Sequence, residues 1–202
     1  MIRLGIFGGT FDPPHLAHLI LADEACDQMH LTKVLWVLTP YPPHKEGKPI
    51  TPWLHRLEML KRAISDNNSF ELCSVDIDRP PPHYAVDTMN ILKQQYPGAK
   101  LFYLMGGDSL SQLPTWERPH EFIQVCNALV VMHRSNDHIG FDTLEHILPG
   151  IKQKTIFIKA PLVEISGADI RRRVAERKPF RYYLPDSVYR LILEQNLYRG
   201  SN

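Results

Sequence analysis

Short apolar runs alternate with stretches of helical periodicity along most of the chain. Six runs have the length and the β-branched or aliphatic content of buried strands: residues 3–7, 34–38, 72–77, 101–105, 129–132 and 155–158. Between these runs, apolar positions recur at helical spacing, as Leu57, Leu60 and Ile64 do. Helices are predicted over residues 12–29, 51–64, 86–95, 168–176 and 186–195, with a short helix after Asp108. This alternation predicts an α/β fold built on a doubly wound parallel sheet.

Proline marks the predicted connections. Most of the 17 prolines fall in three segments, 13–14, 40–52 and 80–82, where they begin helices or stiffen loops. Residues 134–154 are interpreted as an excursion before the last strand. We expect one domain over residues 1–202, in which residues 166–202 form a small helical subdomain at the carboxyl edge of the sheet.

The composition is that of an ordinary globular chain of 202 residues, with 44% hydrophobic and 22% charged residues. A net charge of +1 gives no general attraction to nucleic acid or to a membrane surface. No apolar run approaches the roughly 18 residues that cross a bilayer, and residues 1–7 hold too short an apolar stretch for a signal peptide. Three scattered cysteines without a CxxC pair fit a reducing compartment, so we expect a cytoplasmic protein with no nucleic-acid or membrane partner.

The first predicted strand is followed by Gly8, Gly9 and Thr10, at an edge where α/β sheets bind ligands. The two glycines are predicted to end the strand and to let backbone N–H groups approach a phosphate. The segment GGTFDPPH matches neither the dinucleotide pattern GxGxxG nor the P-loop pattern GxxxxGK[ST]. Asp12 is predicted to cap the following helix, with two prolines in its first turn.

His15 and His18 are three residues apart, so they share one face at the start of the predicted helix. Backbone N–H groups and the positive end of the helix dipole favour anions there, and two imidazoles would add hydrogen bonds to a polyphosphate. From the residues alone, two other interpretations stay open: a pair of surface histidines, or two ligands of a metal. The sequence offers no third ligand beside them, so no metal site on the protein is predicted.

Residues 8–18, GGTFDPPHLAH, resemble the TFDPxHxGH motif of the nucleotidyltransferase superfamily, with Ala17 in place of the usual glycine. Residues 165–171, ISGADIR, resemble in part its second motif, ISSTxIR, in the expected order and at the expected distance. Gly167 and Ala168 replace a serine and a threonine, so two hydroxyl donors are missing and the affinity for ATP is open. The resemblance implies the Rossmann-like fold of these adenylyl- and cytidylyltransferases.

The middle of the chain is similar to bacterial nicotinate-nucleotide adenylyltransferases. The segments that carry this resemblance are PPHK at 42–45, residues 79–88, MGGDS at 105–109, LPTW at 113–116 and YLPDSV at 183–188. The resemblance covers nearly the whole chain. It implies adenylyl transfer from ATP to nicotinate mononucleotide in NAD biosynthesis, with release of pyrophosphate. It also implies ATP and a pyridine mononucleotide as partners, and Mg²⁺ carried by the ATP phosphates as the cofactor.

The residues and the resemblance together assign roles on the ATP side. His15 and His18 are the expected catalytic residues, as donors to the ATP phosphates. The expected ATP-binding residues are Gly8, Gly9, Asp108, Arg134, Ser166 and Arg171. For two of them a simpler role stays open: Asp108 also suits a helix N-cap, and Arg171 is one of three consecutive arginines that solvent would surround.

The expected mononucleotide-binding residues are Thr10, Lys45, His83, Tyr84, Ala85 and Trp116. Trp116 would stack on the pyridine ring and Lys45 would hold a phosphate, although a lone tryptophan is more often part of a core and a loop lysine is more often solvated. The family holds a ring carboxylate partly through backbone N–H groups, which the resemblance places at Ala85 and Glu117. His83 stands where the family has serine. A cationic His83 would favour a carboxylate and Glu117 would oppose one, so nicotinate is preferred and the amide stays open.

Two alternatives to this function stay open. One is adenylyl or cytidylyl transfer to another phosphorylated substrate, such as nicotinamide mononucleotide or phosphopantetheine. The other is a nucleotide-binding regulator of weak catalytic activity, which the change at Gly167 and Ala168 allows, although retention of both histidines, Lys45 and Trp116 argues against it. The sequence also leaves the oligomeric state open, including a homo-oligomer.

Overall fold

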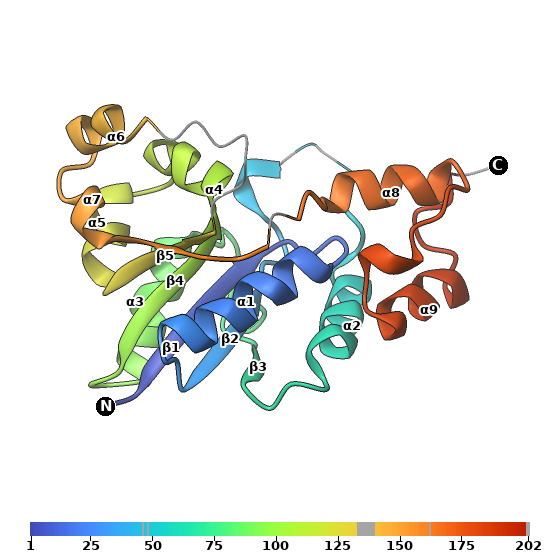
Figure 1. Cartoon of the computed structure of the whole chain (residues 1–202), viewed down its shortest axis with the longest axis horizontal. Helices are drawn as coiled ribbons and strands as arrows, with labels where there is room; N and C mark the ends of the chain where they lie inside the picture. Colours follow the sequence, from blue (N-terminus) through green and yellow to red (C-terminus); the bar gives the residue numbers. More distant parts are fainter. Residues whose placement is uncertain (46, 48, 133–139, 162, 201–202) are drawn as a thin grey trace.

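Six parallel strands form the centre of the structure, a computed structural model that describes residues 1–45, 47, 49–132, 140–161 and 163–200 (Figure 1). The strands are β1 (Arg3–Gly9), β2 (Lys33–Leu38), β3 (Phe70–Cys73), β4 (Lys100–Gly106), β5 (Ala128–Met132) and β6 (Thr155–Ile158). Their order in the sheet is β3-β2-β1-β4-β5-β6, and every neighbouring pair is parallel. The predicted doubly wound parallel sheet is therefore confirmed, with its change of winding direction between β1 and β4.

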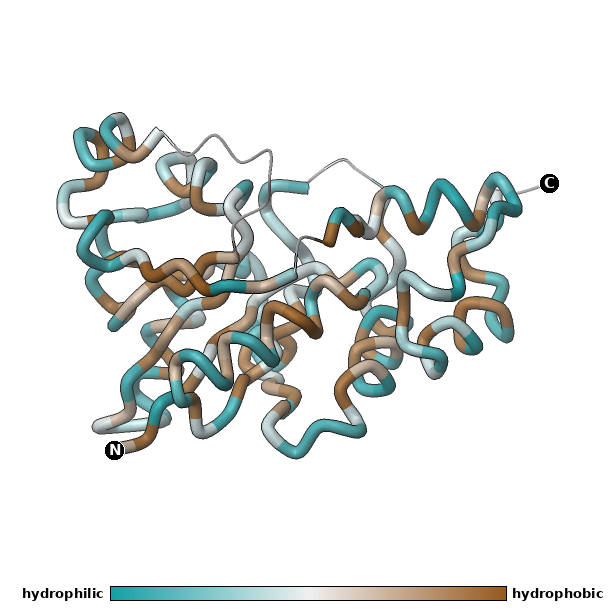
Figure 2. The backbone as a smooth tube through the Cα atoms, in the orientation of Figure 1, coloured by the Kyte–Doolittle hydropathy of each residue, from teal (hydrophilic) through white to brown (hydrophobic). Residues whose placement is uncertain are grey.

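Helices cover both faces of this sheet and enclose two apolar cores. One core includes side chains of α1 (Leu16–Gln28), α2 (Trp53–Ile64), α8 (Gly167–Ala175) and α9 (Asp186–Glu194). The other includes side chains of α3 (Ala85–Gln95), α4 (Gly107–Gln112), α5 (Pro119–Val125), α6 (Phe141–Ile147) and α7 (Ile151–Lys154). Short 3-10 turns are η1 (Pro43–Lys45), η2 (Leu113–Thr115) and η3 (Arg181–Tyr183). Figure 2 shows apolar and hydrophilic positions alternating along the helices, as expected for helices that pack one face on a sheet.

The predicted excursion over residues 134–154 lies partly outside the described residues. Its described part, from residue 140, forms α6 and α7. None of the helices in the described ranges has the length and apolarity needed to cross a membrane.

The first strand is longer than predicted. Gly8 and Gly9 do not end it: they continue β1 and pair with β2 in the register Gly8↔Val37 and Gly9↔Leu38. The prediction is wrong because glycine permits a turn but does not require one, and extended backbone is open to it as well.

The third strand is shorter than predicted and lies earlier in the chain. β3 ends at Cys73 and not at residue 77. The chain turns at Ser74, whose carbonyl oxygen accepts hydrogen bonds from the N–H groups of Ile77 at 2.7 Å and Asp78 at 2.9 Å. The alternation that predicted a strand here reflects the packing of this turn, in which Val75 is buried.

The first helix begins later than predicted, and Asp12 is not its N-cap. α1 starts directly after His15, which occupies the N-cap position with extended backbone. The prediction is wrong because Pro13, the first residue of the helix it required, precedes Pro14, and a residue before proline is disfavoured from the helical region. The Asp12 carboxylate instead accepts hydrogen bonds from the backbone N–H of Thr51 (3.2 Å) and from the hydroxyl of Tyr198 (2.7 Å).

Arg56 of α2 is fully buried and holds together the loops at the carboxyl edge of the sheet. It is 1% exposed. Its guanidinium donates hydrogen bonds to four main-chain carbonyl oxygens: those of Thr51 (2.8 Å), Thr10 (2.8 Å), Thr39 (3.0 Å) and Pro40 (2.6 Å). Burial lowers the pKa of Arg56, and the nearby Asp12 carboxylate opposes that shift. This one side chain therefore sets the ends of β1 and β2 relative to the start of α2.

The C-terminal helices, which lie beside α2 in Figure 1, are tied to the turn after β1 through Asp12. Arg171 of α8 donates to the carbonyl oxygen of Asp12 at 2.6 Å, and Tyr198, which follows α9, donates to its carboxylate. Gly167 lies against the same carbonyl, because a Cβ built at this position would come within 2.7 Å of the Asp12 oxygen. Glycine in place of the family's serine therefore removes a hydroxyl and also avoids a close contact with the Asp12 carbonyl oxygen.

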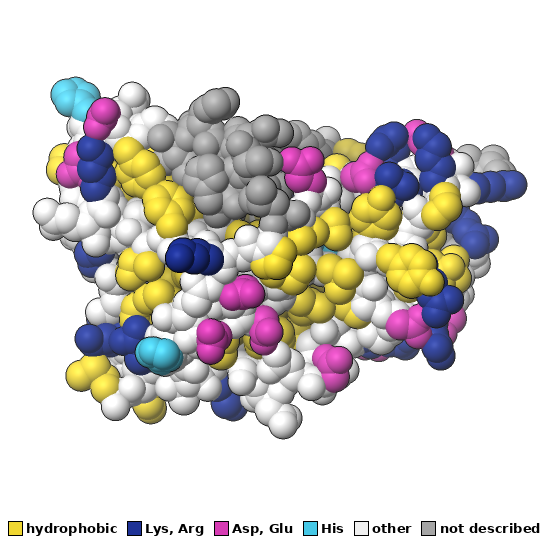
Figure 3. Space-filling model, viewed as in Figure 1, with side chains coloured by type: hydrophobic (Ala, Val, Ile, Leu, Met, Phe, Trp, Pro, Cys, Tyr) yellow, Lys and Arg dark blue, Asp and Glu magenta, His cyan; other side chains and the backbone are white. Residues whose placement is uncertain are grey.

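The outer surface of the C-terminal segment is rich in charge. Figure 3 shows Lys and Arg side chains gathered at this end of the molecule, with Asp and Glu among them. Arg172 and Arg173 pair with Asp169, and Arg190 pairs with Asp186. These basic residues therefore form exposed ion pairs, which contribute little to stability.

Replacing Arg56 with methionine is expected to lower the free energy of unfolding by roughly 3–5 kcal/mol, because four main-chain carbonyl oxygens lose the donors of a buried guanidinium at once. The matched control is Arg62→Met on the same helix, where the side chain is partly exposed and pairs with Glu58 and Glu194. The control should cost less than about 1 kcal/mol. Urea unfolding of both variants measures the difference, and equal losses would contradict the role given to Arg56.

Restoring the family's serine with Gly167→Ser is expected to lower the free energy of unfolding by about 1–3 kcal/mol, because the new Cβ would press on the main chain at Asp12. The control is Ala168→Thr, which restores the neighbouring threonine at an exposed position and should change stability by less than about 0.5 kcal/mol. The unfolding free energies of both variants are measured and compared with that of the parent. A Gly167→Ser protein as stable as the parent would show that the contact with Asp12 has room for a side chain.

Candidate active site

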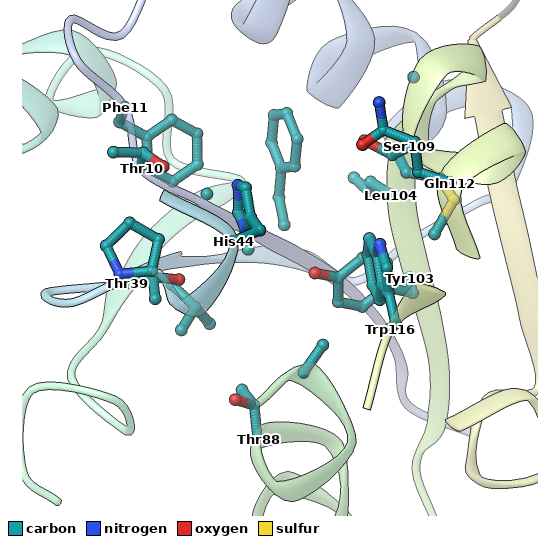
Figure 4. A pocket seen from close by; sticks show the side chains of 18 of the residues that line it. Thr10, Phe11, Thr39, His44, Thr88, Tyr103, Leu104, Ser109, Gln112 and Trp116 are labelled. Atoms are coloured by element: carbon teal, nitrogen blue, oxygen red, sulfur yellow. The ribbon is translucent and has the colours of Figure 1, made fainter. Parts of the chain in front are cut away.

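A cavity of about 550 Å³ lies at the carboxyl ends of β1, β2 and β4, beside the point where the sheet changes its direction of winding. Its walls come from the ends of these strands, from the first turns of α1, α3 and α4, and from η1 and η2 (Figure 4). Open α/β sheets bind their ligands at this place, because the connections on either side leave the sheet on opposite faces. The volume suits a nucleotide-sized ligand, since such pockets range from roughly 300 to 1,000 Å³.

Most of the predicted site residues line this cavity: Gly8, Gly9, Thr10, His15, His18, His83, Tyr84, Ala85, Asp108 and Trp116. Three other predicted residues that the structure describes, Lys45, Ser166 and Arg171, are not part of the lining. Lys45 lies in η1 directly after His44, which does line the cavity. Arg134 falls outside the described residues.

His15 and His18 are in contact at the start of α1. Their rings stack with 3.6 Å between centroids and 20° between planes. The backbone N–H of His15 donates to Nδ1 of His18 at 3.2 Å, so Nε2 carries the proton when the His18 ring is neutral. The first turn of α1 adds backbone N–H groups and the positive end of the helix dipole. This end of the cavity therefore suits an anion.

The glycines of β1 make room for side chains as well as for a ligand. A Cβ at Gly8 would come within 2.7 Å of the Tyr103 hydroxyl, and one at Gly9 would come within 2.9 Å of the Phe11 ring. Phe11 itself has a φ of 47°, in the left-handed region that costs a non-glycine residue about 1–3 kcal/mol. Its ring packs edge-on against Phe7 at 5.4 Å and against His18 at 5.2 Å. This packing holds the tight reversal that brings Thr10 to the cavity.

Aromatic side chains form another part of the wall. Tyr103, near the end of β4, meets Trp116 edge-on at 6.0 Å, and Phe122 supports both rings from the core. Burial raises the pKa of Tyr103, so its hydroxyl stays protonated and can donate. Figure 4 shows Trp116 and Tyr103 together, with Thr10 and His44 on the other side of the cavity. An exposed edge of such a cluster is a surface on which a flat ring can stack.

The loop before α3 is held by a buried ion pair. Asp76, which is 3% exposed, accepts hydrogen bonds from Arg79 at 2.9 and 3.1 Å and from the Thr88 hydroxyl at 2.7 Å. Arg79 also donates to the carbonyl oxygens of Pro82 (2.8 Å) and Tyr84 (3.3 Å). The backbone at the start of α3 is therefore fixed in place beside the cavity.

The predicted residues of α4 and α8 have structural partners of their own. Gly106 and not Asp108 is the N-cap residue of α4, so the alternative role of Asp108 as an N-cap is wrong. Ser166 is the N-cap of α8, where its hydroxyl accepts from the N–H of Asp169 at 3.1 Å. Arg171 uses one guanidinium nitrogen to bind the Asp12 carbonyl. Ser166 and Arg171 thus help to build and dock α8 whether or not they touch a ligand.

Several residues that line or support the site are not among those predicted from the sequence. Tyr103 and Thr88 line the cavity, and Arg56 and Asp76 hold its loops. Two of them leave a signal in the sequence. Arg56 is a charged residue on the apolar face of a helix, four residues before Leu60. Tyr103 is the only residue of the strand LFYLM whose side chain carries a polar group at its end. Three of the carbonyl oxygens that bind Arg56, those of Thr10, Thr39 and Pro40, however, lie far from it in the sequence.

Comparison with known proteins identifies relatives along the whole chain. A family model described as cytidylyltransferase-like matches residues 6–173. A protein of Thermomicrobium roseum named "Probable nicotinate-nucleotide adenylyltransferase" is 43% identical over 199 residues, which are 98% of this chain and 92% of the relative. The nicotinate-nucleotide adenylyltransferase of Bacillus subtilis (strain 168) is 37% identical over 204 residues, which are 99% of this chain and 100% of the relative.

Solved structures share the fold. Plasmodium falciparum nicotinic acid mononucleotide adenylyltransferase complexed with NaAD superposes with a TM-score of 0.80 at 18% identity, covering 98% of each chain. Its complex with APC gives a TM-score of 0.78 with the same identity and coverage. At this identity the superposition shows the fold alone, and the two sequence comparisons supply the rest. The chain belongs to the cytidylyltransferase-like family and, within it, groups with the nicotinate-nucleotide adenylyltransferases.

Proposed function

We propose that the protein transfers the adenylyl group of ATP to nicotinate mononucleotide, a step of NAD biosynthesis. An oxygen of the mononucleotide phosphate forms a bond to the α-phosphorus of ATP. The bond from that phosphorus to the oxygen bridging to the β-phosphate breaks, and pyrophosphate leaves with that oxygen. The observation that carries the proposal is one cavity, in a chain of this family, that combines stacked histidines with an aromatic wall.

The chemistry asks the protein for placement and charge stabilisation more than for proton transfer. The attacking phosphate is already an anion, so no general base is needed. The obstacles are repulsion between two anions, the alignment of the attacking oxygen with the leaving group, and the charge that develops on pyrophosphate. Fixed hydrogen-bond donors around the phosphates address all three.

The anion-binding end of the cavity provides such donors. His15 and His18 lie beside the start of α1 and would donate to the ATP phosphates. Thr10 and the backbone of Gly8 and Gly9 lie next to them, where the two nucleotides would meet. The fixed position of Thr10, whose carbonyl oxygen is bound by Arg56, keeps these donors in place before the substrate arrives.

The neighbouring elements would complete the two nucleotide sites. Asp108 at the start of α4 would accept a hydrogen bond from the adenosine ribose or base, and Ser166 and Arg171 at the start of α8 would approach the triphosphate. Trp116 would stack on the pyridine ring. Lys45, which follows the lining residue His44, would hold the phosphate of the mononucleotide.

Magnesium enters this proposal as part of the ATP substrate. Among the described residues, no group of three or more His, Cys, Asp or Glu side chains is arranged to hold a metal ion. The ATP phosphate oxygens are the hard ligands that Mg²⁺ prefers. The ion neutralises part of the triphosphate charge, while the histidines and backbone N–H groups position the phosphates.

The test is release of pyrophosphate with Mg²⁺-ATP and each candidate acceptor. The expected result is dinucleotide formation with nicotinate mononucleotide at a kcat/KM on the order of 10-fold or more above that with the amide, because a site built for a carboxylate leaves buried donors unpaired beside an amide. Preference for CTP or for phosphopantetheine would contradict the proposed substrates. Nucleotide binding without turnover on any acceptor would favour a regulator.

Replacing His18 with glutamine is expected to lower kcat on the order of 100-fold with the fold intact. The imidazole donor to the transition-state phosphates is lost. A glutamine at this third helical position can still accept from the N-cap N–H, so the bond that His15 now makes to His18 has a substitute. Steady-state kinetics measure the effect, and His120→Gln, an exposed histidine of α5, is the matched control. Turnover close to that of the parent would contradict a catalytic role for His18.

A further inference from the structure

The imidazole of His83 is buried in the wall of the cavity, and neither of its ring nitrogens has a hydrogen-bond partner. The residue is 4% exposed, and both Nδ1 and Nε2 are unsatisfied among the residues that the structure describes. Leaving a buried polar atom unpaired costs free energy comparable with the loss of a hydrogen bond. Such atoms are rare in folded proteins and each calls for an explanation, of which an unfilled ligand site is one.

The loop around His83 prevents the side chain from finding a partner by a shift of its backbone. Arg79 donates to the carbonyl oxygens on both sides of it, those of Pro82 and Tyr84. Arg79 is held in turn by the buried carboxylate of Asp76. The position of the imidazole is therefore set before any ligand binds, which reduces the entropic cost of binding.

His83 lines the same cavity as Trp116, on which the acceptor ring is proposed to stack. The 11-residue helix α3 begins two residues later, at Ala85, and Tyr84 and Ala85 line the same cavity as Trp116. The start of this helix brings together backbone N–H groups and the positive end of the dipole. An imidazole beside a helix N-terminus, in one cavity with a stacking surface, suits a planar ring that carries an anionic substituent.

Two charged groups act on His83 from its own loop. Asp76 and Arg79 form an ion pair at 2.9 Å, so their opposite effects on the ring largely cancel. Burial lowers the pKa of His83 below its ordinary value; Asp76 raises it in part, and Arg79 lowers it further. The ring is therefore neutral near pH 7 when no ligand is bound.

Other titratable side chains line the cavity with His83: His15 and His18 at the start of α1, His44 in η1, Asp108 in α4 and Glu117. In the first turn of α3, Asp87 pairs with Arg118. Tyr41 stacks on the His83 ring at 6.0 Å with 15° between planes. Glu117 lines the cavity at an exposed position, where solvent screens its charge. Of the two acceptors, only the acid would bring a negatively charged ring substituent to this cavity.

We propose that His83 distinguishes the ring substituent of the acceptor: an imidazole N–H donates to the carboxylate of nicotinate mononucleotide, and the acid binds together with one proton from solvent, which protonates the other ring nitrogen. This inference rests on the proposed function, because it takes a pyridine mononucleotide as the acceptor. The carboxamide of the corresponding amide is uncharged and draws no proton to the ring. The preference for the acid then depends on pH.

The sign of this dependence follows from linkage. The bound carboxylate raises the pKa of His83, which burial lowers in the free protein. The additional affinity for the acid is fully present below the free-state pKa and is lost as the pH rises through the ligand-bound pKa. Backbone N–H groups do not titrate in this range. A site made only of the α3 N-terminus would therefore bind the acid without this proton uptake.

The experiment is isothermal titration calorimetry of both mononucleotides at pH 7, in two buffers of different ionisation enthalpy. The acid and the amide carry the same phosphate. The difference between the numbers of protons taken up when each binds is therefore due to the ring substituent. The proteins are the parent chain, His83→Gln, His83→Ser and the control His120→Gln, each checked by thermal unfolding. Adenylyl transfer kinetics at pH 6.5–8.5 give the ratio of kcat/KM for acid over amide.

We expect the parent and His120→Gln to take up more protons with the acid than with the amide. In His83→Gln and His83→Ser this difference disappears, and the acid-over-amide ratio falls on the order of 10-fold or more and no longer depends on pH. An unchanged proton difference or an unchanged ratio in both folded variants would overturn the role of His83. Failure of the proposed function has another signature, which is the absence of dinucleotide product from the parent chain with either acceptor.

Discussion

The hydrogen bonds from the buried guanidinium of Arg56 determine how the loops of the cavity meet. A cation in a low-dielectric interior is costly unless every donor finds an acceptor. Here the acceptors are four main-chain carbonyl oxygens, of which those of Thr10, Thr39 and Pro40 belong to segments that lead away from β1 and β2. The charge is satisfied only when these segments converge. The packing of α2 on the sheet and the placement of the cavity loops therefore depend on the same hydrogen bonds.

Asp12 extends this arrangement to the end of the chain. Its carboxylate and its carbonyl oxygen accept from Thr51, Tyr198 and Arg171, and the last two lie 186 and 159 residues away in the sequence. Burial raises the pKa of Tyr198, and the Asp12 carboxylate adds to that shift, so the hydroxyl remains a donor. The C-terminal helices thus support the turn after β1. Residues 165–171, which resemble a nucleotide-binding motif, therefore also have a structural role, because Arg171 binds the Asp12 carbonyl oxygen.

The cavity separates two kinds of chemistry. At one end, the stacked rings of His15 and His18 lie at the start of α1, which provides backbone N–H donors and the positive end of the helix dipole for phosphates. Elsewhere on the wall, Tyr103 and Trp116 offer aromatic surface. Gly8 and Gly9 lie between these regions, where any side chain would strike the Tyr103 hydroxyl or the Phe11 ring. An enzyme that joins two nucleotides through their phosphates needs this arrangement, because the charged groups must meet while a flat ring is held apart from them.

The sequence by itself determined the succession of strands and helices and ten of the residues that line the cavity, because periodicity and short motifs reflect interactions over a few positions. It failed at Asp12, which has the chemistry of an N-cap but is followed by two consecutive prolines, and at Gly8 and Gly9, which continue a strand. Only the tertiary structure decided that Arg56 would meet carbonyl groups from three segments and that both ring nitrogens of His83 would be buried with no partner in the described part of the chain. The physical reason is that burial and hydrogen bonds between distant residues depend on where loops converge, and no local pattern records that.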